Sequence, residues 1–201
     1  QDGISPGPSY FGTIDTVLSQ NEPNTNFGNT FSLYVGGDDP SGSGDNLSTL
    51  LYWDISSIPI GSIVEEVSIT LNVFNASNNS YQIHEMKRDW AESESTWNIY
   101  SSGQGWEIPG ALGSQDSGTT VLGSFFPNAT GTDVINLNSE GVALIQSWVD
   151  NPSGNHGLII RNSSTTDGSE FDSREVETMS NRPKLTVFYT DEDTDADSLS
   201  Y

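Results

Sequence analysis

The chain has 201 residues, enough for one well-cored domain, and it carries 28 acidic against 6 basic residues, a net charge of −22. This charge repels nucleic-acid phosphates and anionic membrane surfaces, so we expect neither as a partner. The absence of cysteine excludes disulfides and Cys-ligated zinc, and the apolar runs are too short to span a bilayer. The sequence opens at Gln1 without an initiator Met or a signal peptide, so we expect a secreted product, extracellular or at the cell surface.

Alternating apolar and polar residues predict half-buried antiparallel strands along most of the chain. The pattern is clearest at 65–74, EEVSITLNVF, where Val67, Ile69 and Leu71 share one face. In chain order the candidates are GTIDTVLS (12–19), FSLYV (31–35), LLYWDI (50–55), EEVSITLNVF (65–74), SYQIHEMK (80–87), TTVLGSFF (119–126), DVINL (133–137), HGLIIRN (156–162) and KLTVFY (184–189). Clusters of Gly, Pro, Asn and Asp between them supply turns, so the sequence predicts an all-β sandwich.

One segment has helical spacing instead. In NSEGVALIQSWVDN (138–151), Val142, Ile145, Trp148 and Val149 recur on one helical face. Ser139 is placed to cap this run and Asn151-Pro152 to stop it, so we expect one short helix across an end of the sandwich.

The two ends of the chain differ from the middle. Residues 1–11 contain two prolines and end on Tyr10 and Phe11, whereas residues 191–201 form an acidic tail. Their composition predicts disorder. We therefore divide the chain into an N-terminal arm (1–11), a sandwich (12–190) and a tail (191–201).

Four segments in the same order resemble the DNRLRE-type domain, which overlaps carbohydrate-binding module family 96 and the disaggregatase-related domains. They are TIDTVLSQNEPNTNFGN (13–29), LLYWDISSIPIGSIVEEVSITLNV (50–73), IHEMKRDWAESESTWN (83–98), and the pair ALIQSWVDNPSGNHGLII (143–160) and SEFDSREVETMSNRPKLTVFY (169–189). The resemblance implies an antiparallel jelly-roll-like β-sandwich, commonly non-catalytic and often joined to polysaccharide-degrading enzymes or surface proteins. It does not imply one ligand.

Residues 89–98, DWAESESTWN, combine three carboxylates with two tryptophans. A glycosidase needs two carboxylates that face each other across a cleft, and neighbours on one loop do not establish that geometry. Since Glu107, Glu140 and Glu170 can each be nominated as the second carboxylate, no dyad is specified. The family resemblance places this stretch at a strand end followed by an irregular connection, and we expect a structural role.

The sequence also lacks the residue patterns of zinc enzymes and of enzymes with a Ser or Cys nucleophile. His84 and His156 have no H-x-x-x-H partner, and we assign them to a strand and a loop. A G-x-S-x-G elbow and a thiol nucleophile are missing. The sequence thus predicts a non-enzyme.

Calcium is the ion that the acidic loops favour, because it takes carboxylate and carbonyl oxygens. The alternative at each position is a solvated acidic loop. The candidate calcium ligands are Asp38, Asp39, Asp45, Glu94 and Asp116. Five N-x-S/T sequons provide candidate glycosylation sites at Asn46, Asn75, Asn78, Asn128 and Asn162.

Two hypotheses follow from the sequence. The first is an extracellular structural subunit that forms a homopolymer by strand exchange, since free arms can pair with open sheet edges. Its contact candidates are Ile4, Tyr10, Phe11, Leu199 and Tyr201. We favour it narrowly, because the departures from the family lie at the termini.

The alternative is a carbohydrate-binding module that recognises a polysaccharide, with calcium as a possible bridge. Exposed rings of Trp97, Tyr100 and Trp106 would stack on sugars, and Arg161 and Arg174 would meet uronate carboxylates. Arg174 has a competing interpretation, because acids flank it and favour an ion pair inside the fold.

Overall fold

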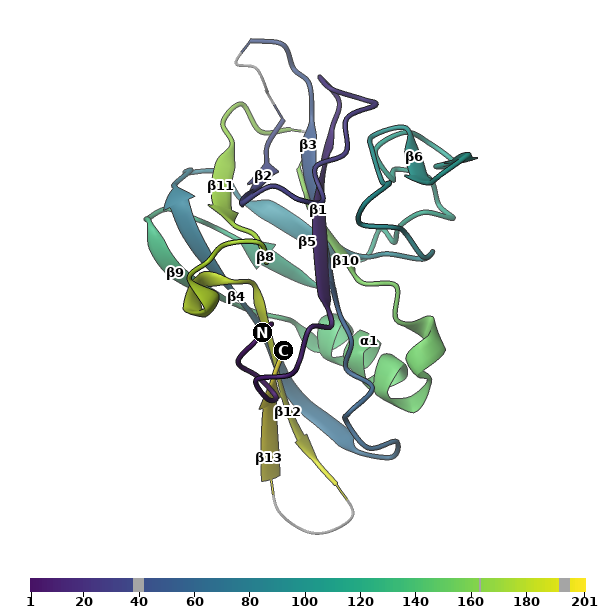
Figure 1. Cartoon of the computed structure of the whole chain (residues 1–201), viewed down its shortest axis with the longest axis vertical. Coiled ribbons are helices and arrows are strands. Elements are labelled where there is room, and N and C mark those ends of the chain that lie inside the picture. Colours follow the sequence, from purple (N-terminus) through teal and green to yellow (C-terminus); the bar gives the residue numbers. More distant parts are fainter. Residues whose placement is uncertain (38–41, 163, 192–195) are drawn as a thin grey trace.

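The computed structural model describes residues 1–37, 42–162, 164–191 and 196–201. It consists of two antiparallel sheets packed face to face and one α-helix (Figure 1), which confirms the predicted all-β sandwich. The five-stranded sheet has the order β1 (Thr13–Ser19), β3 (Leu47–Trp53), β10 (Leu158–Arg161), β5 (Tyr81–Glu85) and β8 (Gly123–Phe125). The six-stranded sheet has the order β13 (Ala196–Ser200), β12 (Lys184–Thr190), β4 (Ile63–Asn75), β11 (Ser169–Asp172) and β2 (Ser32–Val35), with β9 (Gly131–Asn136) also paired to β4.

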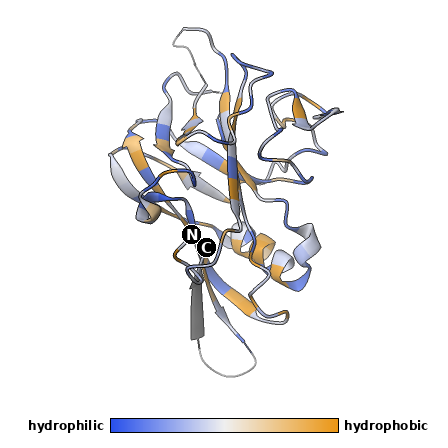
Figure 2. Cartoon of the chain, viewed as in Figure 1, coloured by the Kyte–Doolittle hydropathy of each residue, from blue (hydrophilic) through white to orange (hydrophobic). Residues whose placement is uncertain are grey.

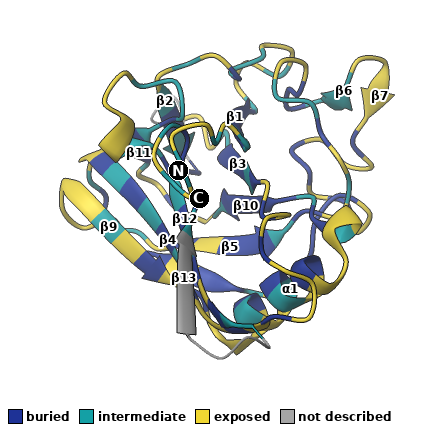
Figure 3. Ribbon diagram, turned by 60° about the horizontal axis from the view of Figure 1, so that its bottom comes forward, coloured by how far each residue is buried: buried dark blue, intermediate teal, exposed yellow. Residues whose placement is uncertain are grey.

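The smaller elements lie outside these two sheets. The strands β6 (Ile99–Ser101) and β7 (Gln104–Gly105) form a separate hairpin. Two short 3₁₀ turns cover Pro152–Gly154 and Met179–Asn181. Figure 3 shows β7 and β9 as largely exposed elements at the periphery.

The main hydrophobic core fills the space between the sheets. Inward-facing residues of the alternating strands supply it, among them Leu51 and Trp53 from β3 and Ile69 and Leu71 from β4, all nearly inaccessible to solvent. In Figure 2 the ribbons change between hydrophilic and hydrophobic colours along single strands, as expected when one face of each sheet is buried. The alternation rule therefore located this core correctly, except at Phe31, which lies before β2 and is exposed.

A second, smaller core lies on the opposite face of the five-stranded sheet. Leu18, Leu50 and Ile159 point outward from β1, β3 and β10 and are completely buried. They are covered by the segment between β5 and β8, which contributes Met86, Trp90, Trp97, Trp106 and Ala111. We call residues 86–117 the lid segment.

The helix α1 (Ser139–Asp150) closes one end of the sandwich, as the sequence predicted. Ile145, Trp148 and Val149 are buried in the main core. The predicted cap is wrong by one residue: Asn138, not Ser139, is the N-cap, and its side-chain oxygen accepts a hydrogen bond from the Gly141 amide at 3.0 Å. An Asn at this position satisfies an amide that would otherwise lack a partner.

Both ends of the chain pack against their own domain. In the N-terminal arm, Asp2 is buried and its Oδ1 accepts a hydrogen bond from the Thr13 amide at 3.0 Å. The tail adds β13 to the edge of β12, with the backbone of Leu199 opposite Val187. Disorder is therefore the wrong expectation for residues 196–200, because the unpaired edge of β12 provides a template for their backbone.

The assembly candidates occupy different environments within this arrangement. Tyr201 is buried, stacks edge-on against Tyr10 at 5.5 Å between ring centroids, and shares a hydrogen bond with Ser57. Ile4 and Phe11 remain exposed. Since the arms find their partners within one chain, the structure gives no support to the strand-exchange hypothesis.

The packing of the core generates a first prediction. Phe171 on β11 is inaccessible to solvent and meets Phe125 edge-on, with 5.4 Å between the ring centroids. Phe171→Ala should lower the free energy of unfolding by about 3–5 kcal/mol, because it leaves a cavity between the sheets. The control Phe31→Ala removes a ring that is 62% exposed and should change stability by less than about 0.5 kcal/mol. Equal losses in urea denaturation would contradict this assignment of the core.

Candidate functional site

The stretch DWAESESTWN is held to the sandwich by an arginine that follows β11. Arg174 donates from Nε to Oε1 of Glu92 at 2.7 Å and from Nη2 to Oε2 at 2.9 Å, a bidentate pair. The same guanidinium contacts Oε1 of Glu175 at 2.9 Å and Oδ2 of Asp2 at 3.3 Å. One cation thus joins the N-terminal arm, the lid segment and the β11–β12 connection. The predicted ion pair of Arg174 inside the fold is confirmed, and its guanidinium is not left free for a uronate.

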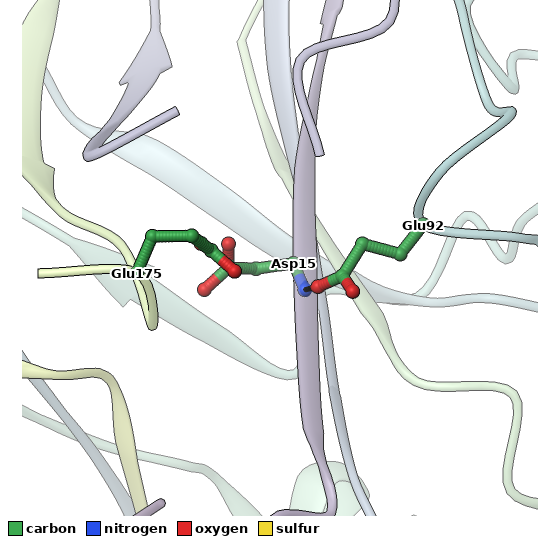
Figure 4. Close-up of side chains that lie close together, drawn as sticks. All are labelled: Asp15, Glu92 and Glu175. Carbon is green, nitrogen blue, oxygen red and sulfur yellow. Dashed lines mark hydrogen bonds between the residues drawn. The ribbon is translucent and has the colours of Figure 1, made fainter. Parts of the chain in front are cut away.

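Asp15 on β1 lies at the centre of this group. Figure 4 shows Glu92 and Glu175 on either side of Asp15, and Glu92 accepts a hydrogen bond from the Asp15 amide at 2.9 Å. Oxygen atoms of the three carboxylates lie within 4.8 Å of one another. The Asp15 side chain itself accepts from the Arg174 amide at 2.8 Å. The guanidinium of Arg174 is the cation that this carboxylate set holds.

Burial makes two of these carboxyls difficult to ionise together. The pKa of Asp15 is raised well above its ordinary value, first by burial and then by the charge of Glu175. Burial likewise raises the pKa of Glu175, although Arg174 works against this shift. The two carboxyls therefore retain protons in the folded protein at pH values where they would lose them in the unfolded chain.

The connection between β1 and β2 fixes the other side of the same loop. The Asn26 amide donates to the carbonyls of Glu92 and Ser95, each at 2.7 Å. A Cβ on Gly28 would lie 2.1 Å from the Glu92 carbonyl oxygen, so this position has no room for a side chain. The NTNFGN part of the family motif consequently serves to seat the lid segment.

The tryptophans of the lid segment face inward. Trp97 and Trp106 are only 7% and 5% exposed, so the expectation of exposed stacking rings is wrong for both. The Trp106 indole donates to the Thr96 carbonyl at 2.9 Å, and the rings of Trp106 and Tyr100 lie 5.5 Å apart. Tyr100 is partly exposed, with the guanidinium of Arg88 4.8 Å from its ring centroid. These rings pack the second core because the outward face of the sheet is itself apolar there.

The lid segment leaves part of the five-stranded sheet uncovered, and a groove of about 430 Å³ remains over β5 and β10. We call it the polar groove. The residues at its surface include Asn46, Gln82, His84, Trp97, Arg161 and Asn162. Leu112, which is 45% exposed, adds an apolar edge.

Arg161 contributes an unusual cation to the polar groove. Its guanidinium donates to Ser117 Oγ at 2.9 Å and to the carbonyls of Ala111 and Gly118 at 3.3 and 3.1 Å. Within the described ranges it forms no salt bridge, unlike Arg174. Burial lowers its pKa, which remains that of a strong base. Three of the five guanidinium N–H groups are therefore used by neutral acceptors.

His84 supplies an acceptor beside Arg161. Its Nδ1 lies 2.8 Å from the Thr120 carbonyl, which can only accept, so Nδ1 carries the proton. Burial lowers the pKa of His84, which favours the neutral ring. Its Nε2 is then an acceptor in the polar groove. The predicted positions of His84 on a strand and His156 in a loop are confirmed.

Of the predicted calcium ligands, the described residues Asp45, Glu94 and Asp116 do not form a common cluster. Asp38 and Asp39 lie outside the described residues. Asp116 is fully buried, accepts from the amides of Glu107, Ile108 and Gly113, and pairs with Arg88. Glu94 is exposed and accepts from the Ser102 amide, whereas Asp45 is partly exposed. Calcium binding stays a prediction. Both carboxylate oxygens of Asp116 already accept hydrogen bonds, so a calcium ion there would compete with these donors.

The sequons fall into two groups. Asn75, Asn78 and Asn128 are exposed. Asn46 and Asn162 are partly buried at the polar groove, where their amide nitrogens donate to Gln20 Oε1 and the Ser80 carbonyl. Each of these two nitrogens therefore already uses one N–H in a hydrogen bond. Glycosylation remains a prediction at all five positions.

Sequence reasoning missed Gln82, His84 and Asn46 as groove residues. The available signal was the alternation of β5, which turns Gln82 and His84 away from the main core. Nothing in the sequence indicates where the lid segment ends on this face. Arg161 was identified by its charge alone.

Glu92 and Asp116 are paired with arginines, and the polar groove lies on the outer face of an antiparallel sheet. The model of carbohydrate-binding module family 96 matches residues 9–102, which confirms the resemblance for the motifs at 13–29, 50–73 and 83–98; the motifs at 143–160 and 169–189 lie outside the match. The matched segment runs from the N-terminal arm to β6, and β10 then inserts between β3 and β5 to complete the sheet. No match to a curated protein was found. None of the described helices is long and apolar enough to cross a membrane.

The Arg174 contacts predict a large stability effect. Arg174→Met should lower the free energy of unfolding by about 3–5 kcal/mol, because it leaves the partly buried carboxylates without their cation. Arg174→Lys should lie between this variant and the wild type, since an ammonium cannot form the bidentate pair. The control Lys87→Ala also removes one positive charge, from an exposed position. Urea denaturation of the four proteins tests this order, and a Met variant as stable as the control would contradict it.

The Asp15–Glu175 contact predicts a pH effect with a defined sign. Because both pKa values are raised, the folded protein keeps protons on these carboxyls that the unfolded chain releases. The free energy of unfolding therefore decreases as the pH rises above the ordinary carboxyl range of about 4. Glu175→Gln removes one member of the pair. The difference in melting temperature, variant minus wild type, should therefore increase between pH 4 and pH 8.

The matched control for this experiment is Glu177→Gln, which removes an exposed carboxylate two positions away. Its melting-temperature difference should stay nearly constant over the same range. A Glu175→Gln difference that is constant or falls with pH would contradict the raised pKa values of the two carboxyls.

Proposed function

We propose that the chain is a non-catalytic module that binds a polysaccharide through the polar groove and acts outside the cell. The observation that carries the proposal is Arg161, a cation placed beside the neutral acceptor His84 and bonded only to neutral groups in the described structure. Sugar hydroxyls both donate and accept, so this pair can hold one hydroxyl from each side.

The position of the groove supports the same function. Asn46, Gln82, His84 and Trp97 lie within the residues that match carbohydrate-binding module family 96. Gln82 is exposed on β5 and offers a side-chain donor and acceptor. The exposed side of Leu112 provides an apolar contact for the C–H face of a sugar ring.

The lid segment makes this groove a defined surface. Its tryptophans anchor it to the sheet, while Arg161 bonds residues 111–118 to the end of β10. A preformed groove lowers the ordering cost of binding. The negative charge of the whole protein favours a neutral polysaccharide, whereas Arg161 can accommodate a single sugar carboxylate at this position.

The proposal predicts that groove variants lose binding, and that Gln82→Ala does so without a loss of stability. Gln82→Ala and Arg161→Gln should each weaken binding of the best ligand about tenfold, the effect of losing roughly 1.4 kcal/mol of hydrogen bonding. Thr132→Ala on β9 is the control, because it is exposed on the other sheet. Calorimetric titration against neutral and uronate-containing polysaccharides provides the measurement, with melting temperatures as a check of folding.

Three results would count against this function. The wild type could fail to bind every polysaccharide of the panel with or without calcium. Binding could survive both groove variants, or turnover of a glycan could be detected.

A further inference from the structure

A second groove of about 710 Å³ lies on the other side of the sandwich, between α1 and β4. We call it the helix groove. The residues that matter to the argument are Glu65, Glu66, Asn136, Ser139, Gln146 and Phe188. It belongs to the six-stranded sheet and is separate from the polar groove.

A β-bulge creates the chemistry of this groove. Phe188 on β12 is opposite Glu66 on β4, but Tyr189 is opposite Val64, so Glu65 is an extra residue without a counterpart. The bulge breaks the alternation, and two consecutive carboxylates become exposed. The ring of Phe188, 43% exposed, lies across the strand pair from Glu66.

These groups have no partner of their own. Within the described ranges, Glu65 and Glu66 form no salt bridge and their side chains form no hydrogen bond, and no Lys or Arg lies at the surface of the helix groove. The Phe188 side chain is exposed although its backbone is in the middle of β12. Two carboxylates without protein partners, next to an aromatic ring, can bind a ligand that carries an ammonium group beside an apolar surface.

The wall of the groove is held in place by α1. The Gln146 side chain accepts a hydrogen bond from the Val64 amide at 2.8 Å and donates one to the Ser62 carbonyl at 2.9 Å. It thereby satisfies two backbone groups beside the bulge. At the other end of the groove, Asn136 and Ser139 are exposed and offer amide and hydroxyl groups. The helix N-terminus lies at that end, and the carboxylates therefore sit away from its positive pole.

We propose that the helix groove binds a sugar unit that carries a free amino group, as in a glucosamine polymer. The ammonium pairs with Glu65 and Glu66, the apolar face of the ring packs on Phe188, and hydroxyls reach Asn136 and Ser139. The net charge of −22 attracts such a cationic polymer over distance, in contrast to an anionic one. This site is independent of the polar groove, and either can exist without the other.

The test is calorimetric titration of the intact chain with a glucosamine hexamer and with the matched N-acetylglucosamine hexamer. The free amine should bind at least about tenfold more tightly, because charge-assisted hydrogen bonds are lost on acetylation. Its affinity should also fall as salt is added.

Variants then locate the site. The double variant Glu65→Gln/Glu66→Gln should weaken hexamer binding by about tenfold or more, and Phe188→Ala by about fivefold. The control Glu22→Gln/Glu177→Gln changes the net charge equally, at exposed positions elsewhere, and should have little effect. Gln82→Ala, in the polar groove, should leave glucosamine binding unchanged. Melting temperatures of all variants should remain within a few degrees of the wild type, since these side chains are exposed.

Several outcomes would overturn the inference. Equal affinity for the acetylated hexamer would show that the ammonium does not contribute to binding. An equal loss of affinity in the control double variant would show that only the net charge of the protein matters. Equally tight binding of a lysine hexamer, lost in the same double variant, would assign the groove to cationic peptides. Loss of glucosamine binding in Gln82→Ala would place the ligand in the polar groove.

Discussion

The bidentate pair between Arg174 and Glu92 is the contact on which the arrangement of the surface depends. It connects the lid segment to the β11–β12 connection, and through Asp2 and Asp15 it also includes the N-terminal arm and β1. A chain with 28 acidic residues cannot place several carboxylates in its interior without a cation. Arg174 is that cation, and burial, followed by the nearby carboxylate charges, still leaves Asp15 and Glu175 with raised pKa values.

The fixed lid segment gives the two sheets different surfaces. On the five-stranded sheet, apolar outward residues near Leu50 require a cover, and the tryptophans of the lid segment provide it. Beyond that cover the same strands carry Gln82, His84 and Arg161, so the sheet continues as a polar surface. On the six-stranded sheet, α1 lies beside β4 and leaves the helix groove open, and the bulge at Glu65 exposes acidic and aromatic groups. The molecule thus has a polar groove that contains one cation, Arg161, and a separate acidic groove.

Sequence patterns predicted the sandwich well because alternation reports directly which residues face the core, as in β4. They also predicted α1, which depends on local spacing, and the pairing of Arg174 with a flanking acid, Glu175; its bidentate partner Glu92 is 82 positions away and was not predicted. They failed for β13, whose strand conformation depends on the distant edge of β12, and for Trp97, whose burial depends on how the lid segment folds back. The polar groove was not predictable for the same reason: Asn46, His84 and Arg161 meet only through the order of strands in the sheet.

The central claim is that a glycan binds the part of the five-stranded sheet that the lid segment leaves open. The most direct measurement is an NMR titration of isotope-labelled protein with the best-binding oligosaccharide, followed at the side chains of His84, Gln82 and Arg161. The account predicts that the His84 imidazole and the Arg161 guanidinium signals shift together and saturate, while the buried indole of Trp106 changes little. Saturating shifts confined to the N-terminal arm and to β13, with His84 and Arg161 unchanged, would contradict it.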